Sequence, residues 1–104
     1  MVIREWRGRA NIARADAYPK HFRDNVISEL TRLPGFLGAT LSRRVFGESA
    51  EFLVLTRWQS MDAVRAFAGA DASKAVVEPG AVAALTDFDA EVRHYEVIEE
   101  WAGH

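Results

Sequence analysis

Residues 36–58, with the sequence FLGATLSRRVFGESAEFLVLTRW, determine the architecture of this chain. Within them, residues 36–46 and 51–58 are two runs with the composition of β-strands, and the second is strongly apolar in its middle. Only the four residues 47–50 separate the two runs. So short a connection predicts that the two strands form a β-hairpin.

The segments before the hairpin differ from each other in hydrophobic period. In residues 1–12 the side chains at even positions and those at odd positions form two different sets, and this alternation predicts a strand. One of the two sets consists of Val2, Arg4, Trp6, Gly8, Ala10 and Ile12. Residues 17–33 carry apolar side chains every three or four positions instead, which predicts a helix with one apolar face. Asp16 can cap the start of this helix, and Pro34-Gly35 ends it.

The segments after the hairpin predict a second helix and a last strand. Ser60 can cap a short helix that ends before Gly69, and residues 81–85 can add a helical turn or two. Residues 91–98 alternate and are rich in residues that favour strands. The order β-α-β-β-α-β predicts a ferredoxin-like α+β fold, in which an antiparallel sheet carries both helices on one face.

Length and charge restrict the architecture and the partners. With 104 residues the chain is too short for two separate cores, so residues 1–104 are predicted to form one domain. The 13 basic and 15 acidic residues give a formal net charge of −2. Nucleic acid is therefore not expected as the main partner, because binding to phosphates requires a surplus of positive charge.

Missing sequence features restrict the chemistry and the location. The sequence contains no cysteine, which excludes disulfides, thiolate nucleophiles and cysteine-based metal sites. The first residues show no apolar core of a secretory signal. The longest apolar run, residues 52–55, is far short of the roughly 20 residues that a membrane span requires. We therefore predict a cytoplasmic protein with no membrane contact.

Both faces of the predicted sheet are partly apolar. The apolar residues 52–55 lie on both faces of one strand, and neither face of residues 91–98 is cleanly polar. A sheet with one face in water alternates cleanly, and the two helices can cover only the other face. We therefore predict a homodimer, in which a second copy of the chain packs its sheet against this one.

Four motifs are spread over nearly the whole chain. They are PGFLG at 34–38, the strand 52–58 followed by SMDA at 60–63, AFAG at 66–69 and VRHYEV at 92–97. Together they resemble the antibiotic biosynthesis monooxygenase (ABM) domain family, within the dimeric α+β barrel superfamily. The resemblance implies a dimeric α+β barrel with a ligand pocket in each protomer, between the sheet and the helices.

The resemblance also implies a type of chemistry. In those members of the family that are enzymes, dioxygen reacts directly with an ionisable aromatic substrate, and no metal or flavin cofactor is needed. Trp58 stands where the polyketide-type enzymes carry a pocket tryptophan, but Val54 stands where they carry an asparagine. Ala68 stands where the haem-degrading branch requires an iron-ligating histidine, so haem degradation is not expected.

Two histidines are candidates for the catalytic base, because an unperturbed imidazole has a pKa near ~6.5. His94 lies in the middle of the last predicted strand, where the alternative is a structural histidine at the dimer interface. His21 and Asn25 lie one helical turn apart, and Tyr18 lies three residues before His21. These three can line the mouth of the pocket, or form a solvated helix flank instead. The two histidines have no third ligand at a recognisable spacing, so no metal site is predicted.

The other site residues are predicted from charge and aromatic character. Arg43 and Arg44 place one guanidinium on each face of their strand, and Arg44 is assigned to the anion of the substrate. Trp58 and Phe67 are assigned to its aromatic ring, although both can also be core residues. Surface charge is predicted for the four arginines near the N-terminus, which are Arg4, Arg7, Arg9 and Arg14.

The predicted function is a cofactor-independent oxidation of a small aromatic quinol or phenol by dioxygen. The alternative is a non-catalytic dimeric module that binds a small ligand, and an isomerase-like protein would use the same histidines. A pocket on the order of several hundred Å³ with a histidine facing inward favours the enzyme. A pocket filled by aromatic side chains favours the module, and the candidates for filling it are Phe52, Trp58, Phe67 and Phe88.

Overall fold

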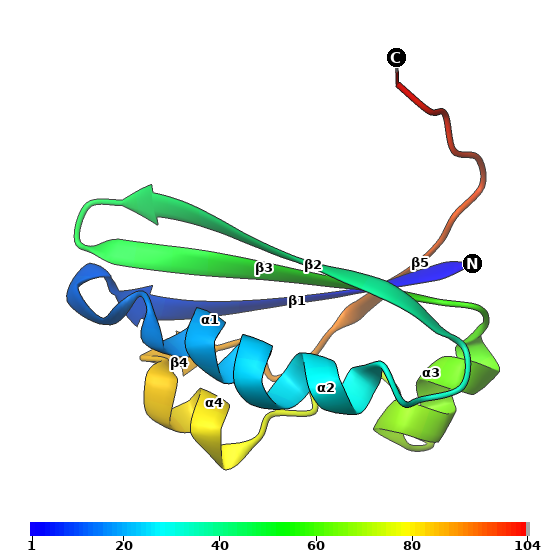
Figure 1. Cartoon of the computed structure of the whole chain (residues 1–104), viewed down its shortest axis with the longest axis horizontal. Helices are drawn as coiled ribbons and strands as arrows, with labels where there is room; N and C mark the ends of the chain where they lie inside the picture. Colours follow the sequence, from blue (N-terminus) through cyan, green and yellow to red (C-terminus); the bar gives the residue numbers. More distant parts are fainter. Residues whose placement is uncertain (104) are drawn as a thin grey trace.

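All the helices lie on one face of an antiparallel sheet in the computed structural model, which describes residues 1–103 (Figure 1). The strands are β1 (Val2–Asn11), β2 (Phe36–Phe46), β3 (Ser49–Trp58), β4 (Asp87–Phe88) and β5 (Arg93–Glu96). The helical segments are η1 (Ile12–Arg14), α1 (Ala17–His21), η2 (Phe22–Val26), α2 (Ile27–Leu30), α3 (Met61–Ala68) and α4 (Pro79–Ala84). This architecture confirms the predicted ferredoxin-like α+β fold.

The hairpin of β2 and β3 forms one side of the sheet, and β1 pairs with the other edge of β3 over its whole length. The outer edge of β1 takes β4 and then β5. The strand predicted over residues 91–98 is therefore shorter than expected. Its first residues pair with another segment, since Glu91 forms an isolated bridge with Lys74 and the Val92 N–H donates to the Ser73 carbonyl at 2.8 Å.

The helix predicted over residues 17–33 is a continuous helical stretch over residues 17–30. Its middle, η2, is a π-helical turn, in which the Ile27 N–H donates to the Phe22 carbonyl. The cap predicted at Asp16 is wrong. The backbone of Asp16 is already helical, with φ −89° and ψ −13°, so its carboxylate makes no capping bond and lies 3.7 Å from Arg43 instead.

The predicted boundaries of the second helix are confirmed by its capping geometry. The Ser60 Oγ accepts a hydrogen bond from the Ala63 N–H at 3.2 Å, and Gly69 takes a φ of 91° just after the last turn of α3. Positive φ favours glycine, which has no Cβ to clash with the backbone. Pro79 begins α4, where its missing N–H leaves no hydrogen bond unmade.

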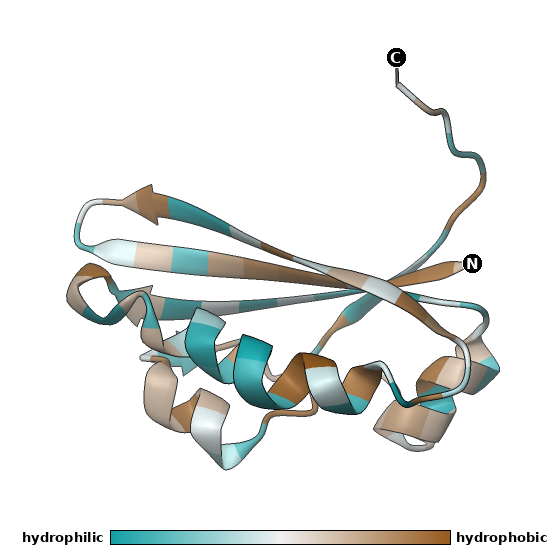
Figure 2. Cartoon of the chain, viewed as in Figure 1, coloured by the Kyte–Doolittle hydropathy of each residue, from teal (hydrophilic) through white to brown (hydrophobic). Residues whose placement is uncertain are grey.

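The alternation of β1 and β3 gives the sheet two different faces. Phe52 and Trp58 are fully buried and pack with apolar residues of the helices. Figure 2 shows the hydrophobic stretches of β3 and α2 in brown. Leu53 and Leu55 point to the opposite face and are only half-buried. No helix among residues 1–103 covers that face, which we call the open face. Nor is any helix in this part of the chain long and apolar enough to cross a membrane.

Candidate functional site

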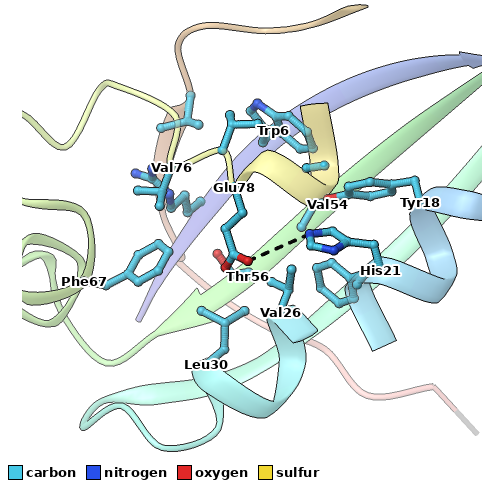
Figure 3. A pocket seen from close by; sticks show the side chains of 15 residues that line it. Trp6, Tyr18, His21, Val26, Leu30, Val54, Thr56, Phe67, Val76 and Glu78 are labelled. Atoms are coloured by element: carbon cyan, nitrogen blue, oxygen red, sulfur yellow. Dashed lines mark ion pairs between the residues drawn. The ribbon is translucent and has the colours of Figure 1, made fainter. Parts of the chain in front are cut away.

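A cavity of about 70 Å³ lies between the sheet and the helical layer. β1 and β3 form its floor, the helical stretch 17–30 forms one wall, and α3, α4 and the segment 76–78 form the others (Figure 3). Most of the lining is aliphatic or aromatic. The ionisable or hydroxyl side chains that reach it are Arg4, Tyr18, His21, Thr56 and Glu78.

The His21 ring presents a buried nitrogen atom to this lining. Only 11% of the side chain is exposed, and its buried Nε2 atom has no hydrogen-bond partner among residues 1–103. Its Nδ1 atom lies 3.3 Å from the amide nitrogen of Asn25, one turn along the helical stretch. An asparagine amide can present its N–H or its oxygen to a histidine, so Asn25 can pair with either tautomer of His21. The imidazole is thus placed to take or give a proton inside the cavity.

Glu78 enters the cavity from the opposite wall. Its Oε2 lies 4.0 Å from the Nε2 of His21, and Figure 3 shows the carboxylate between Phe67 and His21. Burial raises the pKa of Glu78, and the neighbouring carboxylate of Glu29 raises it further. The Glu78 carboxyl therefore keeps its proton more readily than a free one, and it faces the imidazole at a distance too long for a direct hydrogen bond.

Tyr18 lines the cavity next to His21, with 6.3 Å between the ring centroids. Its ring is 4% exposed and lies 5.2 Å from the ring of Phe52 and 5.8 Å from that of Trp6, measured between centroids. Burial raises the pKa of the Tyr18 hydroxyl, and the charge of Glu78 adds to the shift. The hydroxyl therefore stays protonated at neutral pH.

Arg4 corrects the prediction of a surface arginine. Its side chain reaches the cavity from β1, and the residue is only 5% exposed. The guanidinium donates to the carbonyls of Ala72 and Lys74 at 2.6 and 2.9 Å, and it lies 5.7 Å from the ring centroid of Phe67. Burial lowers the pKa of Arg4 to about 10, so it remains a cation at neutral pH. The prediction was wrong because it considered only the charge of Arg4. In β1, Arg4 lies between Val2 and Trp6 on the side of the strand that faces the helices.

The predicted aromatic residues lie at different depths. Phe67 lines the cavity, and Trp58 stacks behind it with 5.2 Å between ring centroids. Trp58 is fully buried, and its indole N–H donates to the Thr56 hydroxyl at 2.9 Å. It therefore positions Phe67 and Thr56 from the core, whereas Val54 lines the cavity itself.

His94 and Arg44 are not brought to the cavity. The Nε2 of His94 lies 2.9 Å from the Nη1 of Arg4, beyond the cavity lining. Burial lowers the pKa of His94, and the positive charges of Arg4 and Arg65 lower it further. Arg44 lies on the open face of β2, 2.9 Å from the carboxylate of Glu51, so the whole sheet separates it from the cavity. Of the predicted polar residues, the structure brings together Tyr18, His21 and Asn25.

Two charged residues of the cavity lining, Arg4 and Glu78, are not among the site residues predicted from the sequence. The signal for Arg4 was present, because it shares the inward parity of Val2 and Trp6 in β1. Glu78 lies in an irregular segment before Pro79, where no periodicity indicates which way a side chain points. Among residues 1–103, no group of three or more metal-ligating side chains is placed to hold a metal ion.

Three solved structures share this fold over nearly the whole chain. MhuD, a haem degrader from Mycobacterium tuberculosis, is 25% identical, with a TM-score of 0.66 over 98% of this chain and 100% of that one. SnoaB, a cofactor-independent oxygenase from Streptomyces nogalater, is 18% identical, with a TM-score of 0.59 over 95% and 93% of the two chains. ActVA-Orf6, a monooxygenase from Streptomyces coelicolor in complex with nanaomycin D, is 17% identical, with a TM-score of 0.60 over 99% and 90%.

The family model gives the more specific result. No curated protein matches the sequence significantly. The model for antibiotic biosynthesis monooxygenases (ABM) matches residues 1–79, which include β1, the hairpin, α3 and most of the cavity lining. This match spans more than half of the chain, and the fold agrees with it. The chain therefore belongs to the antibiotic biosynthesis monooxygenase family.

Proposed function

We propose that the protein is a cofactor-independent oxygenase that oxidises a small aromatic quinol or phenol with dioxygen. The observation that carries this proposal is the buried Nε2 atom of His21, which lacks a hydrogen-bond partner in the described part of the chain and lines a cavity with aliphatic and aromatic walls. A phenolic O–H of a bound ligand supplies the missing partner. In the structure the amide nitrogen of Asn25 faces Nδ1. When the amide turns to present its oxygen instead, the His21 proton stays on Nδ1, and Nε2 is free to remove the phenolic proton. Membership of the ABM family supports this chemistry.

Deprotonation is the step that the protein catalyses in this scheme. The anion is electron-rich enough to pass one electron to dioxygen. For a substrate whose reacting carbon bears two hydrogens, one dioxygen is consumed, one carbonyl is formed and one water leaves. Glu78 relays the proton from His21, and the apolar walls exclude water from the anion.

The cavity has to open before an aromatic ring can enter. Its volume of about 70 Å³ is well below the roughly 300 Å³ at which ligand pockets usually begin. The segment 73–75 is held by backbone hydrogen bonds to Ala90 and Val92, whereas none is found for Val76 and Val77 among residues 1–103. We therefore propose that the wall formed by residues 76–78 moves outward when the substrate enters.

The small volume also favours a second candidate, a non-catalytic module that binds a small ligand. Val54 places an aliphatic group in the lining where the resemblance implies an asparagine in the polyketide-type enzymes. Haem degradation is not proposed, although MhuD degrades haem. Ala68, at the position that the resemblance gives to the iron ligand, has no ligating atom, and the cavity is far smaller than a porphyrin.

The proposed active form is a homodimer. The protomer exposes 6685 Å², whereas a folded monomer of this mass exposes about 5,800 Å². The open face contributes exposed Phe46 and Tyr95 and half-buried Leu53 and Leu55 to that surface. A second copy packed against this face would bury these side chains and close the sheet into the α+β barrel.

Oxygen uptake by metal-free protein tests the proposed activity. Dithranol and a set of hydroquinones serve as substrates, and the His21→Ala variant is compared with the wild type. We expect uptake above the rate of the free substrate, and a loss of at least about 100-fold in the variant, because a positioned general base contributes that much.

Lys20→Ala is the matched control, because Lys20 lies beside His21 in sequence but pairs with Asp24 on the surface. This control is expected to keep the wild-type rate. If the wild type shows no uptake and yet binds these compounds, the non-catalytic module replaces the enzyme. Equal uptake by wild type and His21→Ala would remove His21 from the mechanism.

A further inference from the structure

Arg4 is a buried cation with no buried anion bound to it. Its contacts within 3 Å are two backbone carbonyls and the imidazole of His94, which are all neutral acceptors. Among residues 1–103, no carboxylate lies within 4.0 Å of this guanidinium, although Arg7 and Arg9 on the same strand both have carboxylate partners. A buried cation is normally paired, so the structure leaves the charge of Arg4 available.

The guanidinium also retains hydrogen-bonding capacity. An arginine has five N–H bonds in a rigid fork. Nη1 uses two of them for the Ala72 carbonyl and His94, and Nη2 uses one for the Lys74 carbonyl. The Nε–H and the second N–H of Nη2 have no acceptor among residues 1–103. Two free N–H bonds can bind both oxygens of a carboxylate, or the single oxygen of a phenolate.

The surroundings of Arg4 fit an aromatic anion better than an inorganic one. Phe67 lies under the guanidinium, with its ring centroid 5.7 Å away, and Trp58 stacks behind Phe67. The other charged group of the cavity, Glu78, lies on the His21 side and makes no ion pair with Arg4. The cavity is therefore polarised, with a cation at one end and an acid–base pair at the other.

We propose that Arg4 is the ligand-binding cation of this cavity, and that the protein selects aromatic ligands bearing an anionic oxygen over neutral ones of the same shape. The inference rests on the proposed use of the cavity, and it names the ligand class as aromatic carboxylates or phenolates. One end of the ligand binds Arg4, and the ring lies against Phe67. His94 acts as a positioning residue, because its Nε2 fixes the orientation of the guanidinium.

Binding of two matched probes, benzoate and benzamide, tests this inference without any oxygen chemistry. Calorimetry on the wild type is expected to give a dissociation constant at least about tenfold lower for benzoate, because hydrogen bonds to charged groups are stronger than neutral ones. Arg4→Met is expected to remove this preference, because it weakens the binding of benzoate far more than that of benzamide. Arg4→Lys, which keeps the charge and loses the fork, is expected to be intermediate.

Arg7→Met is the matched control, since Arg7 lies on the open face of the same strand and pairs with Glu5. It is expected to bind both probes like the wild type. If Arg4→Met does not fold, the affinities of the wild type and of Arg4→Lys for the two probes test the inference instead. Equal affinities for benzoate and benzamide in the wild type would overturn the inference, as would an unchanged preference in Arg4→Met. Anion preference without oxygen uptake would support the inference and contradict only the proposed oxygenase.

Discussion

Gly80 controls the position of the His21 ring. A Cβ at this position would lie 2.6 Å from both Cε1 and Nδ1 of His21, which is closer than side chains can pack. The absence of a side chain at this position in α4 therefore allows the imidazole to lie against the helix, with Nε2 directed at Glu78.

A Gly80→Ala variant is expected to lower the rate of oxygen uptake without lowering the free energy of unfolding. Alanine favours the helix by about 1 kcal/mol over glycine, whereas the added methyl forces the imidazole to rotate. We expect oxygen uptake to fall by about 100-fold, the loss that small misplacements of a catalytic group produce. Urea unfolding should show little change. Ala83→Ser, at an exposed position of the same helix, is the control, and equal rates in the two variants would contradict this role of Gly80.

The His94 imidazole is expected to make stability depend on pH. Because burial and then the charges of Arg4 and Arg65 lower its pKa, the folded chain binds fewer protons at this site than the unfolded chain. The free energy of unfolding should therefore fall as the pH drops below about 6.5, the ordinary value for histidine. Urea titrations of wild type and His94→Gln check this. Gln keeps an acceptor for Arg4 and is expected to flatten the curve, and parallel curves would refute the assignment.

At the residue scale, the sequence identified several residues of the cavity but could not show on which face of the sheet others would lie. Tyr18, His21 and Phe67 line the cavity as expected of site residues, but their catalytic or binding roles remain predictions. Arg44 failed to reach the cavity because a strand presents alternate residues to opposite faces, and the register that placed Arg44 beside Glu51 is set by the hairpin. Glu78 comes from a segment without a pattern, so only the folded chain shows its direction.

At the scale of the elements, local sequence rules placed the hairpin and the second helix. α3 begins and ends where Ser60 and Gly69 indicate. The hairpin is present, but its predicted connection 47–50 was too long, because β3 already begins at Ser49 and only residues 47–48 form the turn. The π-helical turn η2 was not predictable, because spacings of three and four residues fit an α-helix equally well. The shortened last strand was also missed, since its first residues bond to the segment 73–75, far away in the sequence.

The cap of α3 gives a prediction at this scale. Ser60→Ala removes the hydroxyl that accepts from the Ala63 N–H, and it is expected to lower the free energy of unfolding by about 1 kcal/mol. Ser60→Asp keeps a capping oxygen and should restore the wild-type value in the same urea titration. A loss of the same size in both variants would show that the cap contributes nothing.

At the scale of the whole molecule, the protomer is more open than a monomer of its size. Its radius of gyration is 14.1 Å, against about 13 Å for a compact domain of this length. Part of this openness comes from the segment after β5, which extends away from the sheet (Figure 1) and contains the exposed Ile98 and Trp101. The open face is the other contribution, and the sequence already indicated it, because the apolar residues of β3 face both sides of the sheet.

Sedimentation equilibrium is expected to give twice the mass of the chain. Leu55→Arg, at a half-buried position on the open face, should shift the equilibrium to the monomer, because a charge buried in a dimer interface without a partner is costly. Val82→Arg adds the same charge on the exposed side of α4 and should remain dimeric. A monomeric wild type at micromolar concentration would contradict the proposed dimer.

Deprotonation of a bound aromatic by His21 is the step on which the proposed function depends. Anaerobic titration of the protein with dithranol measures it, since the absorption of the anion differs from that of the neutral compound and oxygen cannot consume it. We expect the anion spectrum to appear on binding at a pH where free dithranol is neutral, and to be absent with His21→Ala, which should still bind. A bound ligand that remains neutral in the wild type, or that ionises equally in His21→Ala, would contradict this function for the cavity.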